Sequence, residues 1–166
     1  MRKIVIGVMG PGTDVSETNR QNAYELGKLI AQAGWVLLTG GRNVGVMEAA
    51  NLGAKSVKGL TIGILPTADE NGISQSVDIA IFTDMGNARN NINVLSSDLV
   101  IACGMGAGTA SEVALALKAH KPVILLTDNQ QSKLFFKSLS AENILIAKTP
   151  ENAIAFANKI LTNRQK

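Results

Sequence analysis

The feature that most limits the folds open to this chain is the stretch of residues 104–112, with the sequence GMGAGTASE. It separates a strand-like segment from a helix-like one. Residues 97–103 are apolar and of strand length, whereas residues 113–118 favour a helix. The glycines Gly104, Gly106 and Gly108 allow a positive φ and a close approach of ligand to backbone. A helix start also presents unpaired N–H groups and the positive end of the helix dipole. The stretch therefore predicts a cradle for an anion, above all for phosphate.

The end of this stretch has a second interpretation. Thr109-Ala110-Ser111-Glu112 fits a capping box, in which Thr109 caps the amide of Glu112 and the Glu112 carboxylate returns to the amide of Thr109. Spacing alone leaves Glu112 open between a cap and a functional carboxylate. A cap needs none of the three glycines, so their presence favours ligand binding.

Apolar strand-like segments recur along the whole chain and alternate with helical patterns. The expected strands cover residues 3–9, 35–38, 60–65, 77–82, 97–103, 122–126 and 144–147. This alternation predicts a Rossmann-like α/β fold, with a mostly parallel sheet and helices on both of its faces. We expect residues 1–166 to form a single ligand-binding domain.

The expected helices differ in their apolar faces. The first helix is expected to bury Ala23, Leu26, Ile30 and Ala33, and the helix that follows residue 87 to bury Ala88, Ile92 and Leu95. Further helices are expected at residues 47–54, 113–118 and 151–161. Residues 113–117 are apolar all round, which predicts packing against a neighbouring helix, in this chain or in another subunit.

Four unusual loops follow strands, at residues 10–14, 40–45, 86–89 and 104–109. Open parallel sheets bind ligands at the carboxyl ends of their strands, so the loops are expected to share one crevice. The candidate ligand-binding residues in these loops are Gly10, Gly12, Gly40, Gly41, Arg42, Gly45, Arg89, Gly104, Gly106, Ala107, Gly108 and Thr109.

Two arginines are expected at this crevice. Arg42 is either a phosphate ligand or a solvated loop residue, and the sequence favours neither. Arg89 opens a helix, where a cation opposes the helix dipole, and such a departure from local preference favours a functional role. Arg89 and Glu112 would then face one another as an acid–base pair or as a salt bridge. Ordinary NAD binding is disfavoured, because the first strand lacks a G-x-G-x-x-G and no acidic residue ends the second strand.

Composition excludes several classes of function. A single cysteine, Cys103, and a single histidine, His120, leave too few ligands for a zinc site, so no protein-bound metal is expected. Cys103 is expected to be a small buried residue and His120 to interact with a helix C-terminus. The net charge of +3 with scattered basic residues does not predict nucleic-acid binding. No apolar run approaches the ~20 residues of a membrane span, and no signal peptide is evident, so a cytoplasmic protein is expected.

These residues resemble the motifs of a known family. The motif positions are Gly40-Gly41-x-x-x-Gly45-x-Met47, Arg89 at a helix start, and Gly106-x-Gly108-Thr109-x-x-Glu112. They are similar to those of the family that includes the Lonely Guy (LOG) cytokinin-activating phosphoribohydrolases, long mislabelled lysine decarboxylases. The resemblance covers nearly the whole chain and implies a dimeric Rossmann-like protein whose glycine-rich loop holds a nucleotide phosphate. It also implies that Thr109 contacts this phosphate and that Arg89 and Glu112 carry N-glycosidic bond cleavage.

The chain departs from the hydrolase pattern at three places. Gly104-Met105-Gly106 replaces Pro-Gly-Gly, Ser111-Glu112 replaces a pair of glutamates, and residues 86–91 lack the Met-His-x-Arg-Lys form. The chain is more similar to the molybdenum cofactor carrier branch. We therefore expect a cytoplasmic carrier of a phosphorylated small molecule, the molybdenum cofactor above others, which assembles as a homodimer or a dimer of dimers and passes cofactor to molybdoenzymes. A nucleoside 5'-monophosphate phosphoribohydrolase, with Arg89 and Glu112 as catalytic residues, is the alternative.

Overall fold

A computed structural model describes residues 2–164, and within them seven parallel strands form one sheet. The strand order is β4-β3-β2-β1-β5-β6-β7. The strands are β1 (Val5–Met9), β2 (Val36–Thr39), β3 (Thr61–Leu65), β4 (Ile79–Phe82), β5 (Leu99–Cys103), β6 (Val123–Leu126) and β7 (Ile144–Ile146). The central strands β1, β2, β5 and β6 are almost continuously buried because helices cover both faces, as parallel sheets require. The predicted Rossmann-like α/β class is confirmed.

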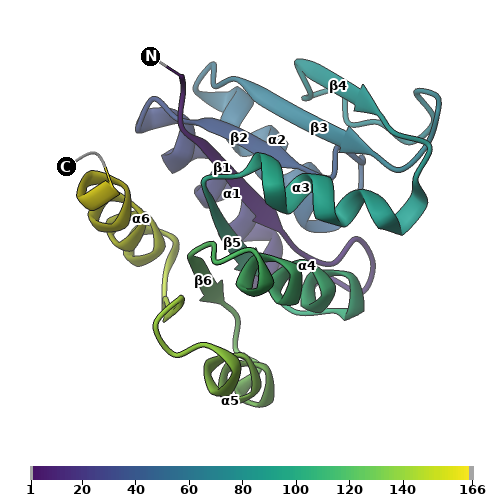
Figure 1. Cartoon of the computed structure of the whole chain (residues 1–166). Helices are drawn as coiled ribbons and strands as arrows, with labels where there is room; N and C mark the ends of the chain where they lie inside the picture. The colour runs from purple at the N-terminus through teal and green to yellow at the C-terminus, as the bar shows by residue number, and fades with distance from the viewer. Residues whose placement is uncertain (1, 165–166) are drawn as a thin grey trace.

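Helices form a layer on each face of the sheet (Figure 1). One layer holds α1 (Glu17–Gln32), α2 (Gly45–Ser56) and α6 (Pro150–Arg164), with α1 in contact with both of the others. The other holds α3 (Asn90–Ser96), which follows the short 3-10 helix η1 (Gly86–Arg89), and then α4 (Ala107–Lys118) and α5 (Gln130–Leu139). Each layer closes its own apolar core against the sheet.

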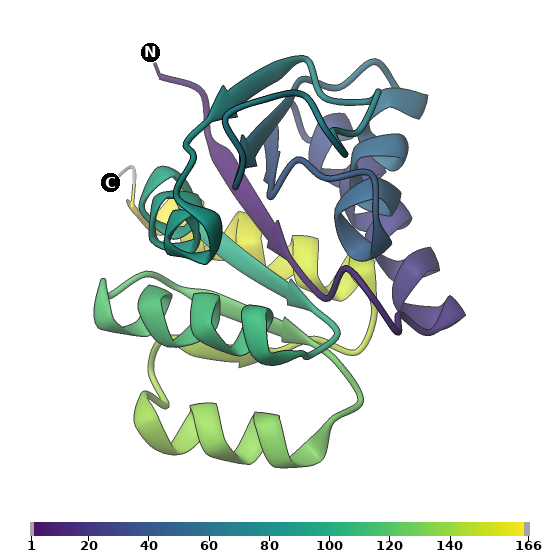
Figure 2. The ribbon, with the colours of Figure 1, turned by 90° about the vertical axis from the view of Figure 1, so that its right-hand side faces the viewer.

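The order of the strands creates a crevice beside β1. The chain moves outward from β1 through β2 and β3 to β4, and then returns to place β5 on the other side of β1. The connections that leave β1 and β5 therefore diverge to opposite faces, which opens a space at the carboxyl ends of these strands. Figure 2 shows the two strands side by side, ending on the same side of the molecule.

The structure corrects the expected buried faces of two helices. In α1, Ala23, Leu26 and Ile30 are buried as predicted, but Ala33 is the exposed C-cap residue. The predicted apolar face of Ala88, Ile92 and Leu95 is wrong, because Ala88 and Leu95 are exposed. Arg89 and Asn93 are buried on this segment instead, and the break between η1 and α3 shifts the helical phase.

The helix α5 was not expected from the sequence. Its segment QQSKLFFKSL buries only Phe136, whereas its other large apolar side chains, Leu134, Phe135 and Leu139, are exposed. The apolar helix α4 packs against α3 on one side and α5 on the other, as its composition predicted. No helix in the described part of the chain is long and apolar enough to cross a membrane.

Cys103 and His120 occupy structural positions. Cys103 is fully buried at the end of β5, and burial raises the pKa of its thiol to about 12. His120 has φ +54° just after α4, and its backbone N–H donates to the carbonyl of Leu117 at 3.0 Å. The predicted buried role of Cys103 is confirmed, and His120 terminates its helix through the backbone.

Candidate functional site

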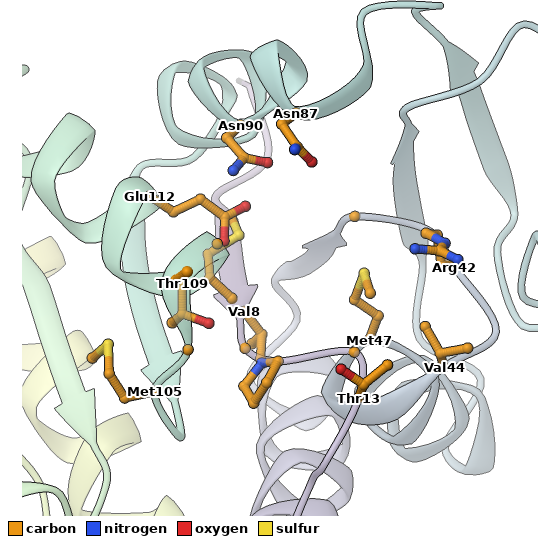
Figure 3. Close-up of a pocket in the computed structure, with 18 of the residues that line it drawn as sticks. Val8, Thr13, Arg42, Val44, Met47, Asn87, Asn90, Met105, Thr109 and Glu112 are labelled. Atoms are coloured by element: carbon orange, nitrogen blue, oxygen red, sulfur yellow. The ribbon is translucent and has the colours of Figure 1, made fainter.

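A pocket of about 570 Å³ occupies the crevice beside β1 (Figure 3). This volume is in the range typical of small-molecule sites. Glu112, Thr109 and Met105 come from the β5–α4 side, whereas Arg42, Val44 and Met47 lie across the cavity from them. The pocket is lined by Val8, Met9, Gly10, Pro11, Gly12, Thr13, Asp14, Asn19, Gly40, Arg42, Val44, Met47, Asn87, Arg89, Asn90, Met105, Gly106, Ala107, Gly108, Thr109 and Glu112.

The helix α4 begins in this pocket without a side-chain cap. Its N-cap residue is Gly106, whose extended backbone leads directly into Ala107. Within the described residues no side chain bonds the first amides of the helix, and Gly108 is open to the cavity, since a Cβ there would meet no atom within 4 Å. The start of α4 therefore offers free N–H groups to an anion.

Of the two interpretations of Thr109 and Glu112, the capping box is wrong. The helix starts at Ala107, two residues before Thr109, so Thr109 is the third residue of the first turn instead of its N-cap. The Thr109 hydroxyl is buried and has no hydrogen-bond partner among the described residues. The Glu112 carboxylate accepts a hydrogen bond from the side chain of Asn93 instead of returning to a backbone amide.

Glu112 is a buried carboxyl group that accepts a hydrogen bond from one neighbouring side chain. It is 6% exposed, and Asn93 Nδ2 donates to its Oε1 at 2.8 Å. Burial raises the pKa of Glu112, and this effect exceeds the opposing effects of the Asn93 hydrogen bond and the charge of Arg89. The group therefore holds a proton to higher pH than an ordinary glutamate, as an acid catalyst or a neutral hydrogen donor requires.

Arg89 brings a buried guanidinium to the same end of the pocket. Burial and the nearby charge of Arg42 lower its pKa, whereas the charge of Glu112 raises it. In the described chain Arg89 forms no ion pair within 4.0 Å, and its Nε has no hydrogen-bond partner. Of the two alternatives for Arg89 and Glu112, an acid–base pair or a salt bridge, the direct salt bridge is therefore wrong, although the two side chains share the pocket. A buried guanidinium without a bound carboxylate is suited to an anionic ligand.

The turn after β2 carries Arg42 and shapes the floor of the pocket. The Thr39 hydroxyl accepts from the Gly41 amide at 3.0 Å and donates to Asn51 Oδ1 at 3.1 Å. Gly41 has φ +74° and lies against β3, which directs exposed Arg42 toward the cavity. A Cβ on Gly40 would overlap the guanidinium of Arg89, so this glycine makes room for the second arginine.

The structure brings most of the predicted residues together. All of the candidate ligand-binding residues line the pocket except Gly41, Gly45 and Gly104. These three glycines have positive φ values and support the loops from outside the pocket lining. Gly45 lies against Pro11 and Gly12, whereas Gly104 lies against Asn19.

The candidate ligand-binding residues did not include the asparagines and methionines of the site, of which Met47 appeared only as a motif position of the family resemblance. Asn19, Asn87, Asn90, Met47 and Met105 line the pocket, and Asn93 supports Glu112 from outside it. The closely spaced asparagines of residues 87–93 were an available signal, because buried amides inside a short helix need partners. Within the described residues there is no group of three or more His, Cys, Asp or Glu side chains placed to hold a metal ion.

Comparison with known proteins identifies close structural relatives. The chain is 62% identical to the molybdenum cofactor binding protein from the phototrophic bacterium Rippkaea orientalis, with a TM-score of 0.96 over 97% of this chain and 99% of that chain. It is 52% identical to the Moco carrier protein from Chlamydomonas reinhardtii, with a TM-score of 0.92 over 98% of this chain and 99% of that chain.

A more distant relative belongs to the hydrolases. The chain is 32% identical over 112 residues to a cytokinin riboside 5'-monophosphate phosphoribohydrolase of Mycobacterium tuberculosis, which covers 63% of this chain and 60% of that protein. A model of the SLOG cluster4 family matches residues 3–154. Because this match spans nearly all of the chain, the protein belongs to the SLOG cluster4 family.

Proposed function

We propose that this protein is a carrier that binds the molybdenum cofactor in the pocket beside β1. The proposal rests on one observation: free helix amides, an unpartnered Thr109 hydroxyl and two arginines lie together in one cavity of about 570 Å³. The molybdenum cofactor is cargo in this proposal, an anionic molecule with a terminal phosphate. The similarity to proteins named as cofactor binders and carriers supports the same function.

The residues of the pocket fit such a cargo. The phosphate would lie at the amides of residues 106–109, where helix N–H groups and the dipole favour an anion. The buried Thr109 hydroxyl and Arg89 Nε lack partners in the described chain, and both are hydrogen-bond donors. Arg42 and Arg89 would offset the negative charge of the cargo.

The test of this proposal compares two ligands on the purified protein. Incubation with the molybdenum cofactor is expected to yield a stable complex that survives gel filtration. Incubation with purine nucleoside monophosphates is expected to release no free base. Failure to retain the cofactor would contradict the carrier function, whatever the result with nucleotides.

A phosphoribohydrolase is the second candidate, because Glu112 and Arg89 share the pocket beside β1 and burial raises the pKa of Glu112. In that case Glu112 would donate a proton or stabilise the positive charge that develops on the ribosyl group. Glu112→Gln would then lower turnover by a factor on the order of a hundred or more, with little change in nucleotide affinity. Absence of base release by the wild-type protein at high concentration would exclude this function.

We further propose that the carrier is cytoplasmic, assembles as a homodimer or a dimer of dimers, and delivers cofactor to molybdoenzymes. Two exposed apolar patches support self-association. The first is Ile79, Ile81 and Phe82 on the edge strand β4, and the second is Leu134, Phe135 and Leu139 on α5. The two elements lie at opposite ends of the molecule (Figure 1), so the two patches could form two separate interfaces of a dimer of dimers.

A further inference from the structure

A second, smaller cavity of about 200 Å³ adjoins the main pocket. Asn19 lines both cavities, so its side chain forms part of the wall between them. The second cavity lies among the first turns of α1, the end of β6, the start of α5 and the segment after β7. In Figure 2 these segments meet at the carboxyl ends of the strands.

The cavity carries two lysines that have no partner for their charges. Lys133 comes from the first half of α5, and Lys148 follows β7. Neither Nζ forms an ion pair or hydrogen bond with any residue in the part of the chain that the structure describes. Asp128 is the one carboxylate among the described lining residues and is exposed, as is Lys148, so two cations outnumber one anion and the cavity has an excess of positive charge.

The remaining polar groups of the cavity also supply hydrogen-bond donors. Thr127 is 8% exposed, and its Oγ1 accepts from the Asn129 amide at 3.3 Å. The hydroxyl hydrogen donates to no residue in the described structure, so it remains available to the cavity. The side-chain amides of Asn19 and Asn22 likewise have no hydrogen-bond partner among residues 2–164. A buried hydroxyl, two amides and two cations form a donor-rich lining that matches a tetrahedral oxoanion.

We propose that this cavity is a second anion subsite, in which Lys133, Lys148 and Thr127 bind a phosphoryl-sized oxoanion. The oxoanion is either a free inorganic ion or a second phosphoryl group of a ligand that extends from the main pocket past Asn19. The subsite itself is independent of the cargo proposed for the main pocket. Only the assignment of the oxoanion to a phosphoryl group of the ligand in the main pocket rests on that proposed function.

Amide-resolved NMR with inorganic phosphate tests the subsite directly. We expect saturable chemical-shift changes at Thr127, Asp128 and Ala147 in the wild-type protein. The double variant Lys133→Gln/Lys148→Gln should weaken this response by about tenfold or more, because it removes two charged donors. The control Lys118→Gln/Lys137→Gln removes the same charge from exposed residues outside both cavities and should leave the response intact.

Two results would overturn the subsite. One is a phosphate response confined to residues 106–109 of the main pocket. The other is a response at Thr127 that the lysine double variant and its control retain equally. Signals at residues 106–109 report the main pocket separately, so failure of the subsite and failure of the proposed cargo site are distinguishable.

A second arm identifies the source of the oxoanion. The affinities of the wild-type protein and the lysine double variant are compared for the cofactor with a terminal monophosphate and for a form extended by a nucleotide. A loss of about tenfold confined to the extended form assigns the subsite to its second phosphoryl group. The alternative result is that the wild-type protein and the double variant bind each form of the cofactor equally well, while the double variant loses the response of Thr127 to inorganic phosphate. This result assigns the subsite to a free oxoanion.

Discussion

Three of the five buried side-chain nitrogen and oxygen atoms that lack a hydrogen-bond partner in the described chain belong to residues around Glu112. Among the described residues, Thr109 Oγ1, Arg89 Nε and Asn93 Oδ1 are buried without a hydrogen-bond partner, and all three residues lie around Glu112. Such atoms cost about 1–3 kcal/mol each when they remain unsatisfied. Native proteins keep few of them, and they are frequent at functional sites. A ligand that bonds to Thr109 and Arg89 would remove part of this cost, so the same atoms link stability to binding.

The Thr109 hydroxyl is expected to serve binding and not stability. Thr109→Val keeps the shape of the side chain and removes a buried hydroxyl that has no partner in the described chain. The melting temperature should therefore stay equal to or rise above that of the wild type, whereas cofactor affinity should fall by about tenfold. Thermal melts and calorimetric titration measure the two effects. A lower melting temperature without loss of affinity would contradict the binding role.

A negative charge at Gly108 should block the anion site without harming the fold. Gly108 is exposed in the first turn of α4 and has space for a Cβ. An aspartate there interacts favourably with the helix dipole, by about 0.3–1 kcal/mol, but repels an anionic ligand. We expect Gly108→Asp to abolish cofactor binding at an unchanged or higher melting temperature. The neutral control Gly108→Asn should retain most of the binding, and equal affinities of the two variants would remove residues 106–109 from the site.

The raised pKa of Glu112 predicts a pH-dependent effect on stability. A carboxyl group whose pKa is higher in the folded state than in the unfolded state stabilises the fold below its unfolded pKa, and this contribution is lost as pH rises through the folded pKa. Glu112→Gln does not titrate and can still accept the hydrogen bond from Asn93. The variant should therefore melt a few degrees above the wild type at pH 8 and close to it at pH 4.

Thermal melts across this pH range need a control for general charge effects. Glu142→Gln removes an exposed carboxylate far from the pocket lining. If both variants show the same pH profile of melting temperature relative to the wild type, the burial of Glu112 does not cause the pH-dependent difference in stability.

At the scale of elements, the site depends on how closely α1 and α2 pack. Gly53 of α2 lies directly against the backbone carbonyl of Tyr24, and Gly27 of α1 lies against that of Ala50. Side chains at these positions would push the two helices apart. Because Asn19 lines the pocket from α1 and Met47 lines it from α2, this spacing also sets the width of the pocket.

A methyl group at this helix contact should be strongly destabilising. Gly53→Ala gains about 1 kcal/mol of helix propensity, but its Cβ would overlap the Tyr24 carbonyl. We expect a net loss of about 1–3 kcal/mol in the free energy of unfolding, measured by denaturant titration. Gly108→Ala is the matched control, since a Cβ there meets no atom within 4 Å, and it should be neutral or stabilising. Equal effects of the two substitutions would contradict the close packing of α1 and α2.

At the scale of the whole molecule, the two apolar patches predict a stepwise loss of assembly. Phe82 of the β4 patch is 41% exposed, and Phe135 of the α5 patch is 57% exposed. If each patch forms one interface of a dimer of dimers, Phe82→Lys or Phe135→Lys should each halve the mass of the assembly, and the double variant should be monomeric. Light scattering after gel filtration measures these masses. A wild-type protein that is monomeric at high concentration would contradict the proposed assembly.

The alternation of short apolar strands with helices was sufficient to predict the Rossmann-like fold, because parallel strands need crossover helices on both faces. The glycine-rich loops were sufficient to predict the position of the pocket, because they all follow strands. The helix α5 was not predicted, although its segment has an apolar side, and the buried face of α3 could not be predicted from apolar residues because it includes Asn93. The roles of Thr109 and Glu112 were also undecided, because one spacing fits both a cap and a site.

The sequence by itself determined the class of fold and the edge of the sheet at which the pocket lies, and it predicted an anionic ligand. These follow from local patterns of apolar residues, glycines and arginines along the chain. Only the tertiary structure decided that Asn93, from a different helix, holds Glu112, and that the Thr109 hydroxyl has no partner in the described chain. It also decided that Lys133, Lys148 and Thr127 share a cavity beside Asn19. These contacts join residues far apart in sequence, so they depend on how the two helical layers pack against the sheet.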